Sequence, residues 1–192
     1  MVEEKSPSRH PQKTTILALG LAAILILSIC AYFLLATPRR KTKASMTSWP
    51  LEFSIELNRT DFLASENVSV RIAAKNLSNE SVSLGWREAR FWYDPPQTAY
   101  FDCQIFSTNG AEVFNWRRGL LAAEVIVGRT LESGEQLVNI FNWTQTTGYP
   151  DFVAVPKGIY FVRASISDAG LSFNGHSITL ALQTPNLIIT IE

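Results

Sequence analysis

The chain has 192 residues, of which 46% are hydrophobic, and its 17 Lys and Arg residues equal its 17 Asp and Glu residues in number. The only basic cluster, residues 39–43, follows a long apolar run, where such clusters anchor a chain to lipid headgroups. We therefore expect no nucleic-acid partner. The two cysteines, Cys30 and Cys103, lie in different predicted segments, which excludes a disulfide-stapled scaffold and makes Cys103 a small buried apolar residue.

The apolar run from Ile16 to Ala36 contains no charged residue. As a helix it is about 30 Å long, which matches the hydrocarbon core of a bilayer. We predict a disordered polar tail over residues 1–13, one transmembrane helix acting as a signal-anchor over 14–37, and a basic linker over 38–48. A signal peptide cleaved after Ala36 is the alternative.

Two signals bear on the side of the membrane that the later residues occupy. Three basic residues precede the apolar run and four follow it, which slightly favours a cytoplasmic domain. Against this, the domain carries a high density of N-glycosylation sequons. These begin at Asn58, Asn67, Asn76, Asn79 and Asn142. We predict a single-pass membrane glycoprotein with an extracytoplasmic domain.

From Trp49 onward, apolar residues alternate with polar ones at the period of two that is typical of half-buried strands. The first strands are expected at 51–57, 68–76 and from 82, with a turn region over 58–66 and a bulge at Gly85. The clearest element is a hairpin in which residues 100–106 and 112–116 flank Asn109-Gly110, a dipeptide typical of tight turns.

The remaining strands are shorter runs separated by turn residues. We expect them at 120–127, 137–143, 159–166, 177–182 and 187–191, with a longer loop over 144–156, a turn over 167–170 and a break at Pro185. Seven to nine short strands without a helical period predict an all-β fold. Residues 49–192 are expected to form an antiparallel immunoglobulin-like β-sandwich, preceded by the one transmembrane helix.

Catalytic and metal-binding patterns are missing from the sequence. His10 lies in the tail, and His176 has no nucleophile motif around it. No Cys/His cluster for zinc and no glycine-rich phosphate loop is present. Asp94, Asp102, Asp151 and Asp168 lie near turns, and a calcium site built from some of them stays open, although their spacing matches no known loop. We expect a protein that is not an enzyme and needs no cofactor.

The central hairpin resembles that of the intracellular proteinase inhibitor (BsuPI) domain family. The resemblance is carried by residues 100–105, by Gly110 and by residues 112–116. Residues 70–76, the turn 131–135, Trp143 and the strand 158–162 also resemble that family, in the same order. Cys103, Phe114 and Ser133 depart from its pattern.

The resemblance implies an immunoglobulin-like sandwich that binds and inhibits serine proteases of the subtilisin type. An inhibitor of this kind has to offer a rigid loop to the active-site cleft of the protease. The candidate partner-binding residues lie on two loops and are Pro95, Pro96, Gln97, Thr146, Thr147, Tyr149 and Asp151. The alternative function is that of a cell-surface module that binds another protein or a glycan, with no protease involved.

Overall fold

The computed structural model describes residue 26 and residues 41–90, 101–118, 121–148 and 150–192. The chain divides into two compact units, residues 1–39 and 40–192. The expected tail and transmembrane helix lie, apart from Ile26, outside the described residues. Within the part of the chain that is described, no helix has the length and apolar character needed to cross a membrane.

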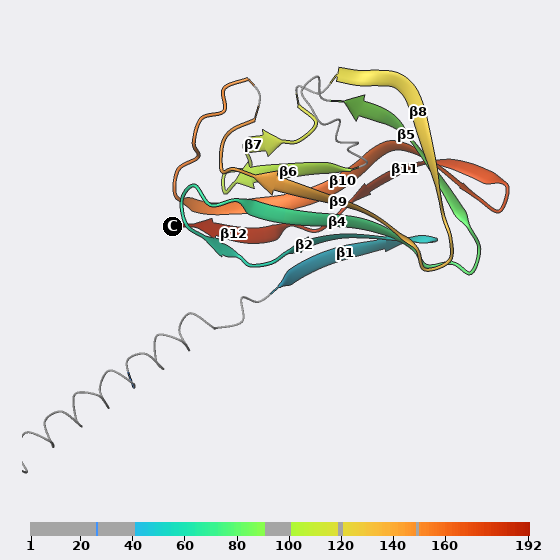
Figure 1. The fold of residues 1–192 in the computed structure, drawn as a ribbon, viewed down its shortest axis with the longest axis horizontal. Coiled ribbons are helices and arrows are strands. Elements are labelled where there is room, and N and C mark those ends of the chain that lie inside the picture. Colours follow the sequence, from blue (N-terminus) through green and yellow to red (C-terminus); the bar gives the residue numbers. More distant parts are fainter. Residues whose placement is uncertain (1–25, 27–40, 91–100, 119–120, 149) are drawn as a thin grey trace, which may run out of the picture. The chain divides into compact units, whose positions relative to one another are not determined.

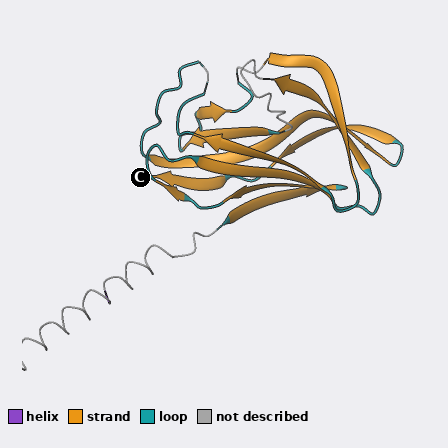
Figure 2. Cartoon of the chain, viewed as in Figure 1, coloured by secondary structure: helices purple, strands orange, loops and turns teal. Residues whose placement is uncertain are grey.

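Unit 40–192 consists of β-strands joined by turns and loops (Figures 1 and 2). The strands are β1 (Thr42–Ser48), β2 (Leu51–Leu57), β3 (Asp61–Phe62), β4 (Val68–Asn76), β5 (Val82–Arg90), β6 (Asp102–Ser107), β7 (Glu112–Asn115), β8 (Leu121–Leu131), β9 (Gln136–Trp143), β10 (Gly158–Phe173), β11 (His176–Gln183) and β12 (Leu187–Ile191).

The strands form two sheets. The first has the order β1-β2-β4-β9 and is antiparallel throughout. The second contains β3-β12-β10-β5-β8, with β6, β7 and β11 attached through β10. Alternate side chains of both sheets enter one hydrophobic core, which includes Phe53, Ile72, Phe101, Ile105 and Ile189. The expectation of an all-β, sandwich-like domain is confirmed.

Strand β10 organises the second sheet. Its first half pairs with β12 on one side and β6 on the other, and its second half pairs with β11 and β5. The register shifts between Ile166 and Ala169, where an irregularity lets one strand serve both sets of neighbours. The segment 167–170, which we expected to be a turn, is therefore part of this strand, and the turn comes later, at Asn174-Gly175.

Three other expectations need correction. Residues 42–48 are not part of a linker, because β1 pairs with β2 over its whole length and turns Ala44 and Met46 toward the core. The turn region 58–66 contains β3, which pairs in parallel with β12, so the second sheet is mixed. Gly85 is not at a bulge, since it pairs directly with Gly128, and the shift lies between Arg87 and Ala89.

The sequence-based hairpin is confirmed as β6 and β7, with Gly110 at a φ of 83° in the turn. Cys103 is a free, buried thiol on β6. Burial raises the pKa of this thiol far above its usual range, so it stays protonated and packs as an apolar side chain.

Asn76 ties together two of the connections that run between the sheets. Its Nδ2 donates to the carbonyl oxygens of Glu80 and Leu131, at 2.7 and 3.0 Å. Its Oδ1 accepts from the backbone N–H and the hydroxyl of Ser78, at 2.9 and 2.7 Å. The side chain is fully buried, so this packing is incompatible with the glycan that the sequon at Asn76 predicts.

Replacing Asn76 with alanine should lower the free energy of unfolding by about 3 kcal/mol, because buried carbonyl and hydroxyl groups would lose their partners. Urea denaturation of full-length protein measures the change. Asn79→Ala is the matched control, since Asn79 is exposed in the same turn. Equal stability of the two variants would contradict the proposed role of Asn76.

Candidate functional site

The candidate site is the loop between β9 and β10, residues 144–157, where the chain crosses from the first sheet to the second (Figure 1). Hydrogen bonds fix its base. The indole Nε1 of Trp143 donates to the carbonyl oxygen of Thr146 at 2.7 Å, and the N–H of Val155 donates to the carbonyl oxygen of Gln145 at 2.9 Å. Thr146 and Ala154 form an isolated antiparallel bridge. The loop therefore begins as a short two-stranded arm.

Gln145 attaches this arm to the body of the domain. It is buried, with a φ of 58°, and its side-chain amide reaches the connection between β3 and β4. Oε1 accepts from the N–H of Ser65 at 2.8 Å, and Nε2 donates to the carbonyl oxygen of Leu63 at 2.8 Å. Since both polar ends of the amide are used, the loop has one preferred position.

Further contacts hold the middle and the end of the loop. The N–H of Thr147 donates to the carbonyl oxygen of Val153, and the N–H of Val153 donates to Oγ1 of Thr147, at 2.7 and 2.9 Å. The N–H of Gly148 donates to the carbonyl oxygen of Val113 on β7 at 3.1 Å. The hydroxyl of Tyr160 donates to the carbonyl oxygen of Pro156 at 2.5 Å.

Aromatic side chains of the neighbouring strands pack together at the base of the loop. The ring of Phe114 on β7 lies 6.2 Å, between centroids, from both Trp143 and Trp116. Trp143 also makes an edge contact with Tyr160, with centroids 6.0 Å apart. Aromatic pairs at these separations contribute beyond their buried area. Trp143 and Tyr160 are buried, and Phe114 and Trp116 are half-buried and pack against the hydrophobic core.

The tip of the loop is apolar and exposed. Phe152 is 61% and Val153 is 59% exposed, and Phe152 has a φ of 49°, a left-handed conformation that a bulky residue adopts only when its surroundings impose it. A backbone held at many points and carrying two large apolar side chains into solvent is the arrangement of a preorganised binding loop.

The sequence-based candidates on this loop are Thr146, Thr147, Tyr149 and Asp151. Thr146 pairs with Ala154 at the base of the loop, and Thr147 accepts a hydrogen bond from Val153. Asp151 is exposed next to Phe152. Tyr149, and the second candidate loop with Pro95, Pro96 and Gln97, lie outside the described residues. Phe152, Val153 and Gln145 were not among the predicted residues. The partners that hold Gln145, Ser65 and Leu63, lie 80 and 82 residues away in the sequence.

Asp102 is the first residue of β6, in the hairpin whose strand β7 is hydrogen-bonded to the loop. It is 7% exposed, its Oδ1 accepts from the N–H of Arg117 at 3.4 Å, and burial raises the pKa of its carboxyl to about 6. The neighbouring Glu112 forms an ion pair with Arg118 at 2.8 Å. Among the described residues, no group of three or more His, Cys, Asp and Glu side chains has the arrangement needed to hold a metal ion.

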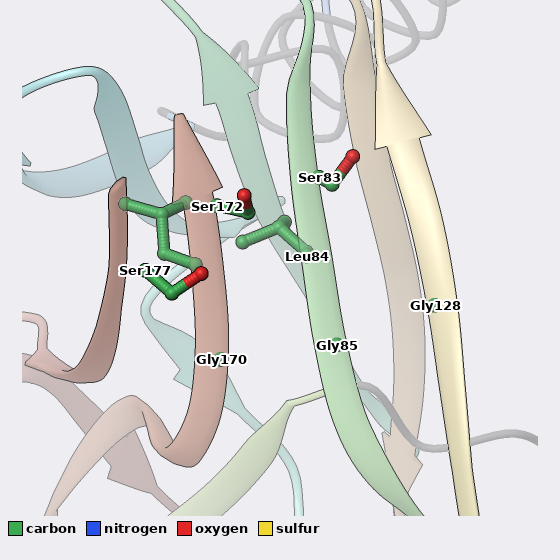
Figure 3. A pocket seen from close by; sticks show the side chains of 8 residues that line it. Ser83, Leu84, Gly85, Gly128, Gly170, Ser172 and Ser177 are labelled. Atoms are coloured by element: carbon green, nitrogen blue, oxygen red, sulfur yellow. The ribbon is translucent and has the colours of Figure 1, made fainter. Parts of the chain in front are cut away.

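In the second sheet β10 pairs with β5, and β5 pairs with β8. Gly170, Gly85 and Gly128 stand in one register row across the three strands (Figure 3). Ser83 and Ser172 flank this row and are exposed. The resulting depression, of about 280 Å³, is shallow and lined by small side chains and backbone.

The four remaining sequons keep their asparagines on the surface. Asn58, Asn67, Asn79 and Asn142 are all exposed.

No family model and no curated protein matches the chain. Among solved structures, it is similar to the C-terminal domain of wzt, with a TM-score of 0.40 and 7% identity over 84% of each chain. It is also similar to a β-glucosidase from Listeria innocua (TM-score 0.37, 10% identity, 79% of this chain and 16% of that one). A third similar structure is a CARDB domain from Pyrococcus furiosus (TM-score 0.34, 13% identity, 72% of this chain and 84% of that one). The chain thus spans 16% of the glucosidase, and the BsuPI resemblance stays a prediction from the sequence.

The pKa of Asp102 makes stability depend on pH. Between about pH 4 and pH 6 the folded state binds more protons than the unfolded state, so the free energy of unfolding should fall as pH rises through this range. Because the pKa of Asp102 is about two units higher in the folded state, the free energy of unfolding should fall by about 3 kcal/mol across this range. Asp102→Asn, compared with the unchanged chain by urea denaturation from pH 4 to pH 8, should lack this fall. An identical pH profile for both proteins would contradict the assignment.

Proposed function

We propose that the domain is an immunoglobulin-like, non-catalytic binding module that inhibits serine proteases of the subtilisin type through loop 144–157. The observation that supports this function best is the pinned loop with Phe152 and Val153 exposed at its tip. The choice of partner follows from the resemblance of the β6–β7 hairpin and its neighbours to BsuPI domains.

In the proposed complex, Phe152 and Val153 occupy apolar subsites of the protease cleft. Burying two such side chains removes apolar surface from water on both partners, and a loop that is already ordered loses little conformational entropy when it binds. The left-handed backbone at Phe152 differs from the extended conformation of a β-strand. The loop therefore blocks the cleft as a plug rather than lying in it as an extended peptide.

We further propose that residues 14–37 anchor the chain in a membrane and that the domain lies on the extracytoplasmic side. The exposed asparagines of four sequons are compatible with glycosylation there.

The inhibition is tested by titrating the full-length chain, in detergent, against a subtilisin-type protease while the cleavage of a small chromogenic peptide is followed. We expect stoichiometric inhibition. Phe152→Ala and Val153→Ala should each raise the inhibition constant about tenfold or more, since anchor residues of this kind contribute above 1 kcal/mol each.

Two further variants separate the tip from its support. Gln145→Ala should weaken inhibition about tenfold, because the tip would remain but the loop would lose its anchor to Leu63 and Ser65. Ile140→Ala is the control, since Ile140 is 59% exposed on β9 outside the loop. Absence of inhibition by a chain with β-type circular dichroism would refute the proposed function.

The orientation is tested by adding a non-specific protease to intact cells that express the chain. We expect the domain to be cleaved before the cells are lysed. A domain that is degraded only after lysis would place it on the cytoplasmic side.

A further inference from the structure

A second pocket lies at the other end of β10, away from loop 144–157. It has a volume of about 210 Å³ and is formed by the β1–β2 turn of the first sheet and the β10–β11 hairpin of the second. Its lining consists of Trp49, Pro50, Leu171, Phe173, Asn174, His176 and Ile178. The pocket shares no residue with the proposed inhibitory loop.

The pocket exists because the β10–β11 hairpin extends beyond the sheet that covers it. Leu171 pairs with Ile178, and Phe173 pairs with His176, so these side chains share the face that points toward the core. On β11, Leu180 is 4% exposed, whereas Ile178, two residues nearer the hairpin tip, is 54% exposed. The apolar inner face of the hairpin is thus progressively uncovered toward its tip.

Trp49 stands at the mouth of this pocket, on the facing sheet. Trp49 is 65% exposed. The next residue, Pro50, is buried, and its carbonyl oxygen accepts from the N–H of Leu77 at 2.8 Å. A large aromatic side chain that is held by an ordered turn and still left in water is typical of a contact residue for a ligand.

The chemistry of the lining restricts the ligand. None of the lining residues is Lys, Arg, Asp or Glu, so a charged ligand would find no counter-ion there. Asn174 and His176 are polar and exposed, and both line the pocket. Each carries both donor and acceptor capacity, which a purely apolar ligand would leave unused.

A neutral sugar ring meets these requirements. One face of a pyranose carries C–H groups that pack on an aromatic ring, and its edge carries hydroxyls that both donate and accept. We propose that this pocket binds a pyranose unit of a neutral saccharide, with Trp49 against the ring face and Asn174 and His176 as hydrogen-bonding partners of its hydroxyls. The site is independent of protease inhibition and gives the glycan-binding alternative a definite location.

The turn at the hairpin tip allows a clean substitution. Asn174 has a φ of 51°, a conformation that glycine adopts without strain, so Asn174→Gly removes the amide and keeps the turn. Trp49→Ala removes the aromatic face, and His176→Ala removes the imidazole. Ile188→Ala is the matched control, because Ile188 is 55% exposed on β12 and does not line the pocket.

The probes are neutral hexasaccharides of glucose, N-acetylglucosamine, mannose and xylose, titrated calorimetrically into the full-length chain in a detergent without a sugar headgroup. We expect at least one of them to bind with a dissociation constant below about 1 mM. Trp49→Ala should weaken that binding at least tenfold, and Asn174→Gly and His176→Ala at least threefold each, while Ile188→Ala leaves it unchanged.

Two results would overturn the proposal. One is that no hexasaccharide binds to the folded chain, and the other is that Trp49→Ala leaves the affinity unchanged. The variants are assayed for protease inhibition in parallel, and because the pocket lies away from the loop, either function can fail without the other.

Discussion

Two buried carboxamide side chains join the connections that run between the two sheets of this domain. Asn76 and Gln145 lie at opposite ends of the β4–β9 pair, and each joins two connections between the sheets. Asn76 bonds the β4–β5 turn and the end of β8, and Gln145 bonds the β3–β4 turn to the β9–β10 loop. A carboxamide suits this task, since it offers donors and an acceptor at once and carries no charge to desolvate.

The same arrangement explains why both proposed binding sites lie at the ends of the sandwich. Along the strands, backbone groups are satisfied by neighbours and apolar side chains by the facing sheet. At the ends, the chain must turn or cross over, and side chains there lose cover from the opposite layer. Loop 144–157 is a crossover of this kind, and the pocket beside Trp49 is an overhang of one hairpin beyond the other sheet. Strand β10 reaches both, because its irregularity after Ile166 lets it continue for 16 residues.

The elements that could be predicted from the sequence are those that depend on a local residue pattern. Strict alternation in Leu51–Leu57 and the Asn109-Gly110 turn identified strands and a hairpin without knowledge of their partners. Strand β1 was not predicted, because Ala44 and Met46 are its only inward apolar side chains. Its strand conformation depends on pairing with β2. The segment 167–170 resembled a turn because Asp and Gly favour turns, and only the pairing of Gly170 with Gly85 and Thr179 keeps it extended.

The candidate site shows the same limit more sharply. The threonines of the loop stood out in the sequence, yet they act on the loop's own backbone. The amide of Gln145 bonds Leu63, 82 residues away in the chain, and Trp143 packs against Phe114 of β7. Trp143 ends strand β9, whereas Phe152 lies in an irregular segment in which no periodicity indicates whether a side chain is buried. The contact surface of the proposed function is therefore defined by the apolar residues that stay exposed in the folded domain, and this exposure is a property of the whole fold rather than of the segment.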